Sequence, residues 1–308
     1  MPPFKEEALI TTQSHEEWLH RRRTGIGGSD AATLMGANSY RDEFCVYVDK
    51  VCDELPVDIM RESAYWGIKL EDLVAAEFEK RENEERARRS WTPIKVIKPT
   101  HTYRSTIHPF AMATIDRWVA HAEPLVFTEM MRIKLSSPDA VLVPDSPDGG
   151  SPYWYQVLGI LEVKTASAYK MKEWEGGIPP YAFNQIQHYL MVTGLERAWA
   201  AALLGGQRFI SHEVDREDGY IEQLAETEAK FWERVQTKSC PTPDPTCSDA
   251  YEARERYERN LGPAPADHTP ASKKYTRAPK RVTTVEVEAV TKPTGSKLPG
   301  WGTAEATL

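Results

Sequence analysis

The sequence has 308 residues, of which 41% are hydrophobic and 27% charged, a balance typical of a soluble globular enzyme or binding protein built around one main domain. A formal net charge of −8 argues against a protein that coats nucleic acid through counterion release alone, although it does not exclude a nuclease. The sequence shows neither an apolar export signal nor a run approaching the about 20 apolar residues of a membrane span, so we expect a cytoplasmic protein without a membrane partner.

Two helix-start signals follow one another near the N-terminus. Ser14 and Glu17 form a capping-box pattern for a helix through WLHRRR, which stops at a group of glycines. Ser29 or Asp30 then begins a short helix, AATLM, that Gly36 can end. The stretch RRRTGIGGSD between the two helices therefore combines arginines, glycines and a serine at a helix N-terminus.

The middle of the chain alternates between helical and strand-like patterns. Apolar residues recur at helical spacing from 61 to 85, which predicts a long helix. Four β-rich runs separated by Pro, Gly, Ser and Asp clusters predict a small meander at 93–99, 111–120, 125–135 and 153–165. The remaining predictions, in chain order, are a helix over 180–194, strands over 197–204 and 208–214, and a helix over 217–236.

We assign residues 1–241 to one domain, with a hairpin inserted at 121–152, and 242–261 to a short helical extension. The last segment, 262–308, is rich in Pro, Thr and Ala with little apolar periodicity, so we expect a largely disordered basic tail. Residues 261–308 hold seven Lys or Arg against four acidic residues, so this part is +3 and the remainder −11.

The four cysteines form two far-separated pairs, Cys45 with Cys52 and Cys240 with Cys247, and each pair encloses six residues. This spacing differs from the tight C-x-x-C of common zinc sites. We expect reduced thiols, and an iron–sulfur site, a zinc site and a disulfide stay open as alternatives.

The segment GILEVKTAS carries the first candidate chemistry. Strand alternation places Glu162 and Lys164 on one face and Leu161 and Val163 on the other, so we expect one buried face and one face that presents the charged pair. An isolated Glu-x-Lys is typical of an exposed ion pair. The pattern gains weight only together with other residues.

Asp116, in ATIDRWV, supplies such a residue from an earlier strand. Two carboxylates from adjacent strands and the Val163 carbonyl are hard oxygen ligands of the kind that Mg²⁺ prefers. A lysine beside the metal, here Lys164, can polarise the attacking water and neutralise developing phosphate charge. Asp116, Glu162 and Lys164 thus suit phosphodiester hydrolysis, whereas Glu129 has its nearest basic residue, Arg132, on the opposite strand face and is the weaker candidate.

Three further side chains lie on predicted helices. Glu71, in WGIKLEDL, is by itself typical of a solvated surface charge. Gln185 and Tyr189 share a helix face at i and i+4, a spacing that packing alone also explains.

The ordered motifs GIGGSD, WGIKLE, ATID, LEVK and QIQHYLMVTG resemble the YqaJ and lambda-exonuclease branch of the PD-(D/E)XK nucleases, from residue 17 to 241. The resemblance implies an α/β (α+β) fold with a restriction-endonuclease-like core, in which helices flank a central mixed β-sheet. It also implies that Asp116, Glu162 and the Val163 carbonyl bind a catalytic Mg²⁺, with Mn²⁺ as a substitute, and that Glu71 completes the metal site or holds water there.

The same resemblance implies roles for the remaining candidates. Lys164 would activate the nucleophilic water, Gln185 would position Lys164 and the scissile region, and Tyr189 would give structural support. Arg23 and Ser29 match the residues that bind a terminal 5′-phosphate in the exonuclease relatives.

The sequence departs from the family pattern at two places. The spacing between the arginines and Ser29 differs from the family pattern, which leaves open which of Arg21, Arg22 and Arg23 contacts the phosphate. The alternative to a phosphate role is that Ser29 only caps the helix. A P-loop is excluded because the stretch lacks G-K-[ST] and follows no strand. The distance from Asp116 to Glu162 marks 121–152 as an insertion, which would cover the cleft or mediate assembly.

We therefore expect a Mg²⁺-dependent deoxyribonuclease of phage recombination type that digests linear double-stranded DNA 5′-to-3′ and leaves 3′ single-stranded tails. The resemblance implies a homo-oligomer, a single-strand annealing recombinase as partner and, if the protein is phage-encoded, the cytoplasm of the bacterial host. An endonuclease of the same fold and an inactive DNA-binding module are the alternatives.

Overall fold

The computed structural model describes residues 4–8, 15–55, 62–99, 101–137, 140–144 and 153–265. The elements follow in chain order as β1 (Phe4–Ala8), α1 (His15–Arg22), α2 (Gly28–Leu34), α3 (Glu43–Val51), α4 (Glu62–Arg88), β2 (Ile94–Ile97), β3 (His101–Ser105), β4 (Met112–Ala113), β5 (Arg117–His121), α5 (Phe127–Ser136), β6 (Leu142–Pro144), β7 (Trp154–Ala166), η1 (Ala168–Lys170), α6 (Met171–Glu175), α7 (Pro180–Thr193), β8 (Arg197–Leu204), β9 (Arg208–Asp215), α8 (Asp218–Thr237) and α9 (Ala250–Leu261). None of the helices in these ranges is long and apolar enough to cross a membrane.

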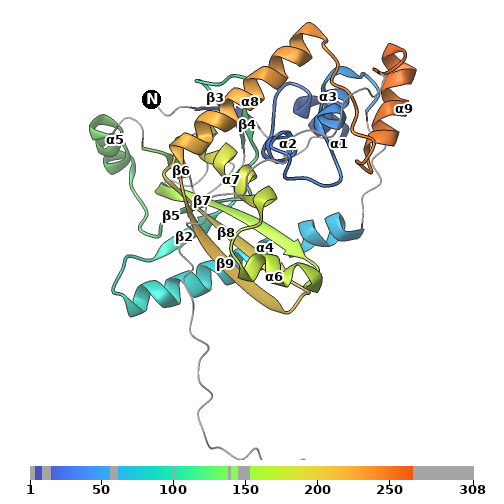
Figure 1. Ribbon diagram of the computed structural model, residues 1–308. Coiled ribbons are helices and arrows are strands. Elements are labelled where there is room, and N and C mark those ends of the chain that lie inside the picture. Colours follow the sequence, from blue (N-terminus) through green and yellow to red (C-terminus); the bar gives the residue numbers. More distant parts are fainter. Residues whose placement is uncertain are drawn as a thin grey trace, which may run out of the picture.

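The central sheet has the strand order β2-β5-β7-β8-β9, and β6 pairs with the first residues of β7. Strands β7 and β8 are parallel and α7 connects them, whereas the other pairs are antiparallel, so the sheet is mixed. The long strand β7 pairs first with β6, then with β5 and finally with β8. The expected fold class, a central mixed sheet flanked by helices, is confirmed (Figure 1).

Helices cover both faces of this sheet. On one face, Leu161 and Val163 of β7 pack with Phe78 of α4, and on the other Ile160 packs in one cluster with Ile186 of α7. The expectation that the Glu162 face is open was wrong, because α7 covers it and leaves Glu162 only 1% exposed. The sequence pattern did not reveal this because a charged pair normally marks a solvated face.

A second sheet, β1-β3-β4, lies against α7 and forms part of the larger core. The run 111–120, expected as one strand, is divided between the two sheets, because β4 belongs to the small sheet and β5 to the central one. Asp116 lies at this break. The short helix α2 packs against α7, α3 and α8, and α9 packs against α3 (Figure 1).

The expected strand over 125–135 was wrong, because residues 127–136 form helix α5. Glu129 explains the difference, since its Oε2 accepts a hydrogen bond from the Val126 amide at 3.1 Å and thereby caps the helix. The inserted segment is thus a helix followed by β6, which forms an antiparallel pair with β7. Glu129, the weaker acidic candidate, has a structural role here.

The other predicted helices and strands match α1, α2, α4, β2, β7, α7, β8, β9 and α8. Six elements had no sequence prediction, namely β1, α3, β3, β6, η1 and α6. The helical extension contains α9, and most of the predicted basic tail, from 266 onward, lies outside the described residues. The division into domain, extension and tail stays a prediction.

Candidate active site

Asp116 and Glu162 meet where β5 begins beside β7. Because Arg117 pairs with Leu161 across the two strands, Asp116 lies next to the Glu162–Val163 step. Asp116 Oδ2 accepts a hydrogen bond from the Val163 amide at 2.8 Å, so the side chain continues the hydrogen-bond ladder where the strand stops. The sheet therefore fixes the orientation of this carboxylate.

Lys164 joins the carboxylates to helix α7. Its ammonium forms an ion pair with Glu162 Oε1 and donates a hydrogen bond to Gln185 Oε1 at 3.1 Å. Gln185 Nε2 in turn donates to the Tyr189 hydroxyl at 2.9 Å. Four of the residues that the sequence singled out thus form one hydrogen-bonded chain from β7 to α7.

The second oxygen of Glu162 is buried and has no hydrogen-bond partner. Buried polar atoms without a partner are rare in folded proteins and often mark a bound ion or a catalytic role. Together with the nearby Asp116 carboxylate, this oxygen fits a divalent cation that prefers oxygen ligands. Mg²⁺ is such a cation, and the residues present are suited to hold it.

The pKa shifts of Glu162, Asp116 and Lys164 are consistent with a cation bound beside the two carboxylates. Burial, reinforced by the Asp116 charge, raises the pKa of Glu162 to about 8, and burial also raises the pKa of Asp116. Burial alone would lower the pKa of Lys164, but the Glu162 and Asp116 carboxylates raise it overall, so Lys164 is protonated at neutral pH. The Lys164 ammonium is thus shared by the buried Glu162 and the half-buried Asp116, and a metal ion would supply the missing positive charge.

Glu71 reaches this region through a residue that the sequence analysis missed. Arg117, which is buried, donates to Glu71 Oε1 at 2.5 Å and also pairs with Asp72, the next residue of α4. The Glu71 charge contributes to the raised pKa of Asp116, which places it near the pair. The position of Arg117, directly after Asp116 in the sequence, was the available signal. The Val163 side chain packs toward α4, and a metal bond from its carbonyl stays a prediction.

The GIGGSD stretch lies directly against this site. A Cβ atom on Gly28 would be 2.6 Å from Gln185 Cγ and 2.7 Å from the Tyr189 ring, so only glycine permits α2 to approach α7 this closely. Ser29 follows at the exposed side of α2. The predicted phosphate stretch and the predicted catalytic chain are therefore neighbours.

Arg22, rather than Arg23, lies beside Ser29. Its Nη2 donates to Ser29 Oγ at 2.9 Å and to Asp30 Oδ1 at 2.8 Å, whereas Arg23 pairs with the exposed Asp53. Among the three arginines that the sequence left open, the structure brings Arg22 to the serine.

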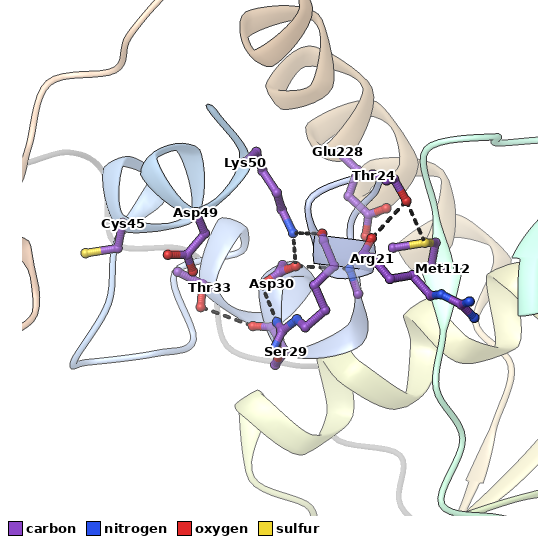
Figure 2. A network of polar contacts seen from close by, with 12 residues as sticks. Arg21, Thr24, Ser29, Asp30, Thr33, Cys45, Asp49, Lys50, Met112 and Glu228 are labelled. Atoms are coloured by element: carbon purple, nitrogen blue, oxygen red, sulfur yellow. Dashed lines mark hydrogen bonds and ion pairs between the residues drawn. The ribbon is translucent and has the colours of Figure 1, made fainter. Parts of the chain in front are cut away.

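Asp30 and Lys50 anchor this arrangement from inside (Figure 2). Lys50 Nζ, which is buried, donates to Asp30 Oδ2 at 2.7 Å and to the Arg22 carbonyl at 2.7 Å. Although burial alone would raise the pKa of Asp30, Lys50 and Arg22 lower it well below the usual range. Sequence reasoning missed Lys50 because α3 itself was not predicted.

Comparison with known proteins places this arrangement in a family. A profile of the YqaJ-like viral recombinase domain matches residues 17–196. The uncharacterized protein YqaJ of Bacillus subtilis strain 168 is 31% identical over 271 residues, which cover 86% of this chain and 70% of that protein. The crystal structure of an alkaline exonuclease, LHK-Exo from Laribacter hongkongensis, has a similar fold at TM-score 0.50 and 15% identity, over 72% of this chain and 93% of that one. A structure of LHK-Exo with dAMP matches equally well at 13% identity. The chain belongs to the YqaJ-like viral recombinase family.

Proposed function

We propose that this protein is a Mg²⁺-dependent deoxyribonuclease that digests linear duplex DNA from 5′ ends and leaves 3′ single-stranded tails. The observation that carries the proposal is the pairing of the half-buried Asp116 with the buried Glu162, which has an unpartnered oxygen, beside the Lys164 ammonium. The family description as a viral recombinase and the similar fold of a protein described as an alkaline exonuclease support it.

Asp116 and Glu162 would hold the metal, with the Val163 carbonyl as a third oxygen and Glu71 at the edge of the site. Bound there, Mg²⁺ supplies Lewis-acid polarisation of the phosphodiester and makes water a better nucleophile. The strand pairing of β5 with β7 keeps the two carboxylates in place, because Asp116 is tied to the Val163 amide. This preorganisation is what a catalytic metal site requires.

Lys164 would act as a charged donor and not as a base, because its raised pKa keeps the ammonium protonated. It would orient the attacking water and stabilise the negative charge that develops on the phosphate. Gln185 accepts one hydrogen bond from Lys164 and donates one to Tyr189, so it fixes the direction in which the ammonium points. Gln185 and Tyr189 are therefore positioning residues.

Arg22 and Ser29 would bind the terminal 5′-phosphate. The guanidinium and the hydroxyl already contact each other, and Gly28 brings them next to Gln185. A charged, bidentate donor such as arginine is suited to phosphate. Holding the terminal phosphate close to the carboxylates would direct hydrolysis to a 5′ end.

The test uses linear duplex DNA with wild type, Lys164→Ala, Asp116→Asn and, as a matched acidic control, Glu129→Gln. The first two variants should lose about 10²-fold or more in cleavage rate, because they remove charge stabilisation and a metal ligand. Glu129→Gln should cleave like wild type, since Glu129 caps α5. If wild type binds duplex DNA with Mg²⁺ present but leaves it intact, the inactive-module alternative is correct.

End recognition has its own comparison. Wild type should degrade linear DNA and spare closed circles, whereas cleavage of both forms would favour the endonuclease. Arg22→Ala should reduce the preference for 5′-phosphate over 5′-hydroxyl ends, and Arg23→Ala, the neighbouring control, should keep it. Mn²⁺ in place of Mg²⁺ should support cleavage. A homo-oligomer and a single-strand annealing partner stay predictions.

A further inference from the structure

Three potential metal ligands meet at the N-terminus of α3, outside the site described above. Asp42, Cys45 and Cys247 each offer one ligand atom, and these atoms lie within 4.8 Å of one another. Among the described residues, no other set of three His, Cys, Asp or Glu side chains comes together this closely. Cys45 is buried, and Asp42 and Cys247 are half-buried, so an ion could enter and keep a water molecule.

Two chain segments hold these groups in place. Asp42 Oδ1 accepts from the Cys45 amide at 2.9 Å and Oδ2 from the Asp244 amide at 2.7 Å, so both carboxylate oxygens are oriented by the backbone. Cys247 Sγ donates to the Tyr40 carbonyl at 2.7 Å. Contacts such as those to Asp42 fix the direction of metal ligands in known sites, whereas the Tyr40 contact holds the protonated Cys247 thiol in the metal-free protein.

The cluster is independent of the catalytic residues. Figure 2 shows Cys45 pointing away from the Asp30–Lys50 pair, on the other side of α3. The remaining cysteines, Cys52 and Cys240, pack in the same apolar surroundings near α9 but do not belong to the three-residue set. They are therefore internal controls for any thiol-dependent property.

We propose that Asp42, Cys45 and Cys247 bind one Zn²⁺ ion, with water as the fourth ligand. Two sulfurs and one oxygen suit zinc, which is tetrahedral, and do not suit Mg²⁺, which takes oxygen ligands. At zinc bond lengths the ligand atoms would lie about 3.3–3.8 Å apart, so a modest inward rotation, with Cys247 leaving the Tyr40 carbonyl, completes the site.

Zinc at this point would join the start of α3 to the segment that leads into α9. Residues 38–45 and 244–249 are otherwise connected by hydrogen bonds, such as that from the Asp249 amide to the Tyr40 carbonyl at 3.0 Å, and by apolar packing in the cluster of Phe44 and Cys45. Burial raises the pKa of Cys45 and of Cys247, so both thiols are protonated without a metal. Zinc uptake should therefore release protons and strengthen as the pH rises.

The test measures metal bound to cysteine and not cleavage. Because the site proposed for Mg²⁺ has no sulfur ligand, a Co²⁺ thiolate band is independent of the proposed nuclease function. Reduced, chelator-treated protein should take up one Zn²⁺ per chain, and Co²⁺ in its place should give a thiolate charge-transfer band. Cys247→Ser, which keeps a hydroxyl for the Tyr40 carbonyl, and Cys45→Ser should lose this uptake. Cys52→Ser and Cys240→Ser should keep it.

Circular dichroism establishes whether each variant is folded. If Cys45→Ser does not fold, Cys247→Ser, at a half-buried position, still tests whether the site binds zinc. The proposal is overturned if reduced wild type takes up no Zn²⁺ or gives no Co²⁺ thiolate band, or if Cys247→Ser still gives that band. The proposal would also be refuted if Cys45 and Cys247 form a disulfide and the reduced protein does not bind zinc. An iron–sulfur chromophore in the purified protein would refute it as well.

Discussion

Gly28→Ala tests whether the approach of α2 to α7 sets the catalytic geometry. The new Cβ would lie 2.6 Å from Gln185 Cγ, about 0.8 Å closer than an ordinary contact, so Gln185 must move. Overpacking of this kind costs about 1–3 kcal/mol, which corresponds to a Tm lower by about 2–12 °C. Moving Gln185 by this amount would also break its 3.1 Å contact with Lys164. A misplacement of about 1 Å can lower kcat by as much as about 100-fold.

Gly27→Ala is the matched control, because its Cβ would have Asp30 Oδ2 at 3.8 Å as its nearest neighbour, and its φ of −98° suits any residue. Replacing a helix-capping glycine by alanine should cost about 0.5 kcal/mol and leave kcat near the wild-type value. The assays are thermal unfolding and the initial rate of linear duplex digestion. A Gly28→Ala protein with wild-type kcat and Tm would show that this contact does not position Gln185.

Three further predictions concern the metal, the ion pair and the insertion. If Glu162 binds Mg²⁺ as proposed, the ion would have to displace a proton, because the pKa of Glu162 is raised to about 8. The Mg²⁺ concentration for half-maximal rate should then rise about tenfold per pH unit below this value, and equal values at pH 6.5 and 7.5 would contradict this. Asp30→Asn should lower the free energy of unfolding, measured in urea, by about 3–5 kcal/mol, because Lys50 is left as an unpaired buried charge. Because the pKa of Asp30 is lowered in the folded protein, the stabilisation by this ion pair should be present above pH 4 and lost as the pH falls further. An unchanged urea midpoint for Asp30→Asn would refute the pairing. Leu135→Ser, at a position 80% exposed on α5, should leave the digestion rate within about twofold of wild type, and a larger loss would place α5 at the DNA.

The sequence predicted much of the hydrogen-bonded chain from Glu162 to Tyr189 because its members recur at short, regular spacings. Glu162 and Lys164 share a strand face, Gln185 and Tyr189 share a helix face, and the structure joins these pairs. Arg117 was missed because its partners lie on α4, distant in sequence, and only folding reveals them.

The elements that the sequence did not reveal were missed for separate physical reasons. Residues 43–51 read as EFCVYVDKV, and six of these nine side chains are buried in α3. Their core, 44–48, is a short continuous apolar run, which a buried strand would show as well. Strands β1 and β3 pair across almost 100 residues, which local patterns cannot show. Helix α5 was mistaken for a strand because its apolar residues follow each other closely in a short run.

The length of strand β7 separates the inserted segment from Glu162. Strand β6 pairs with its first residues, Trp154 to Gln156, whereas Glu162 lies six residues further along. At about 3.3 Å per residue, this separates the anchor point of the insertion from Glu162 by about 20 Å. Insertions or deletions near β6 should therefore leave the geometry around Glu162 unchanged. A reporter domain could be attached there for the same reason.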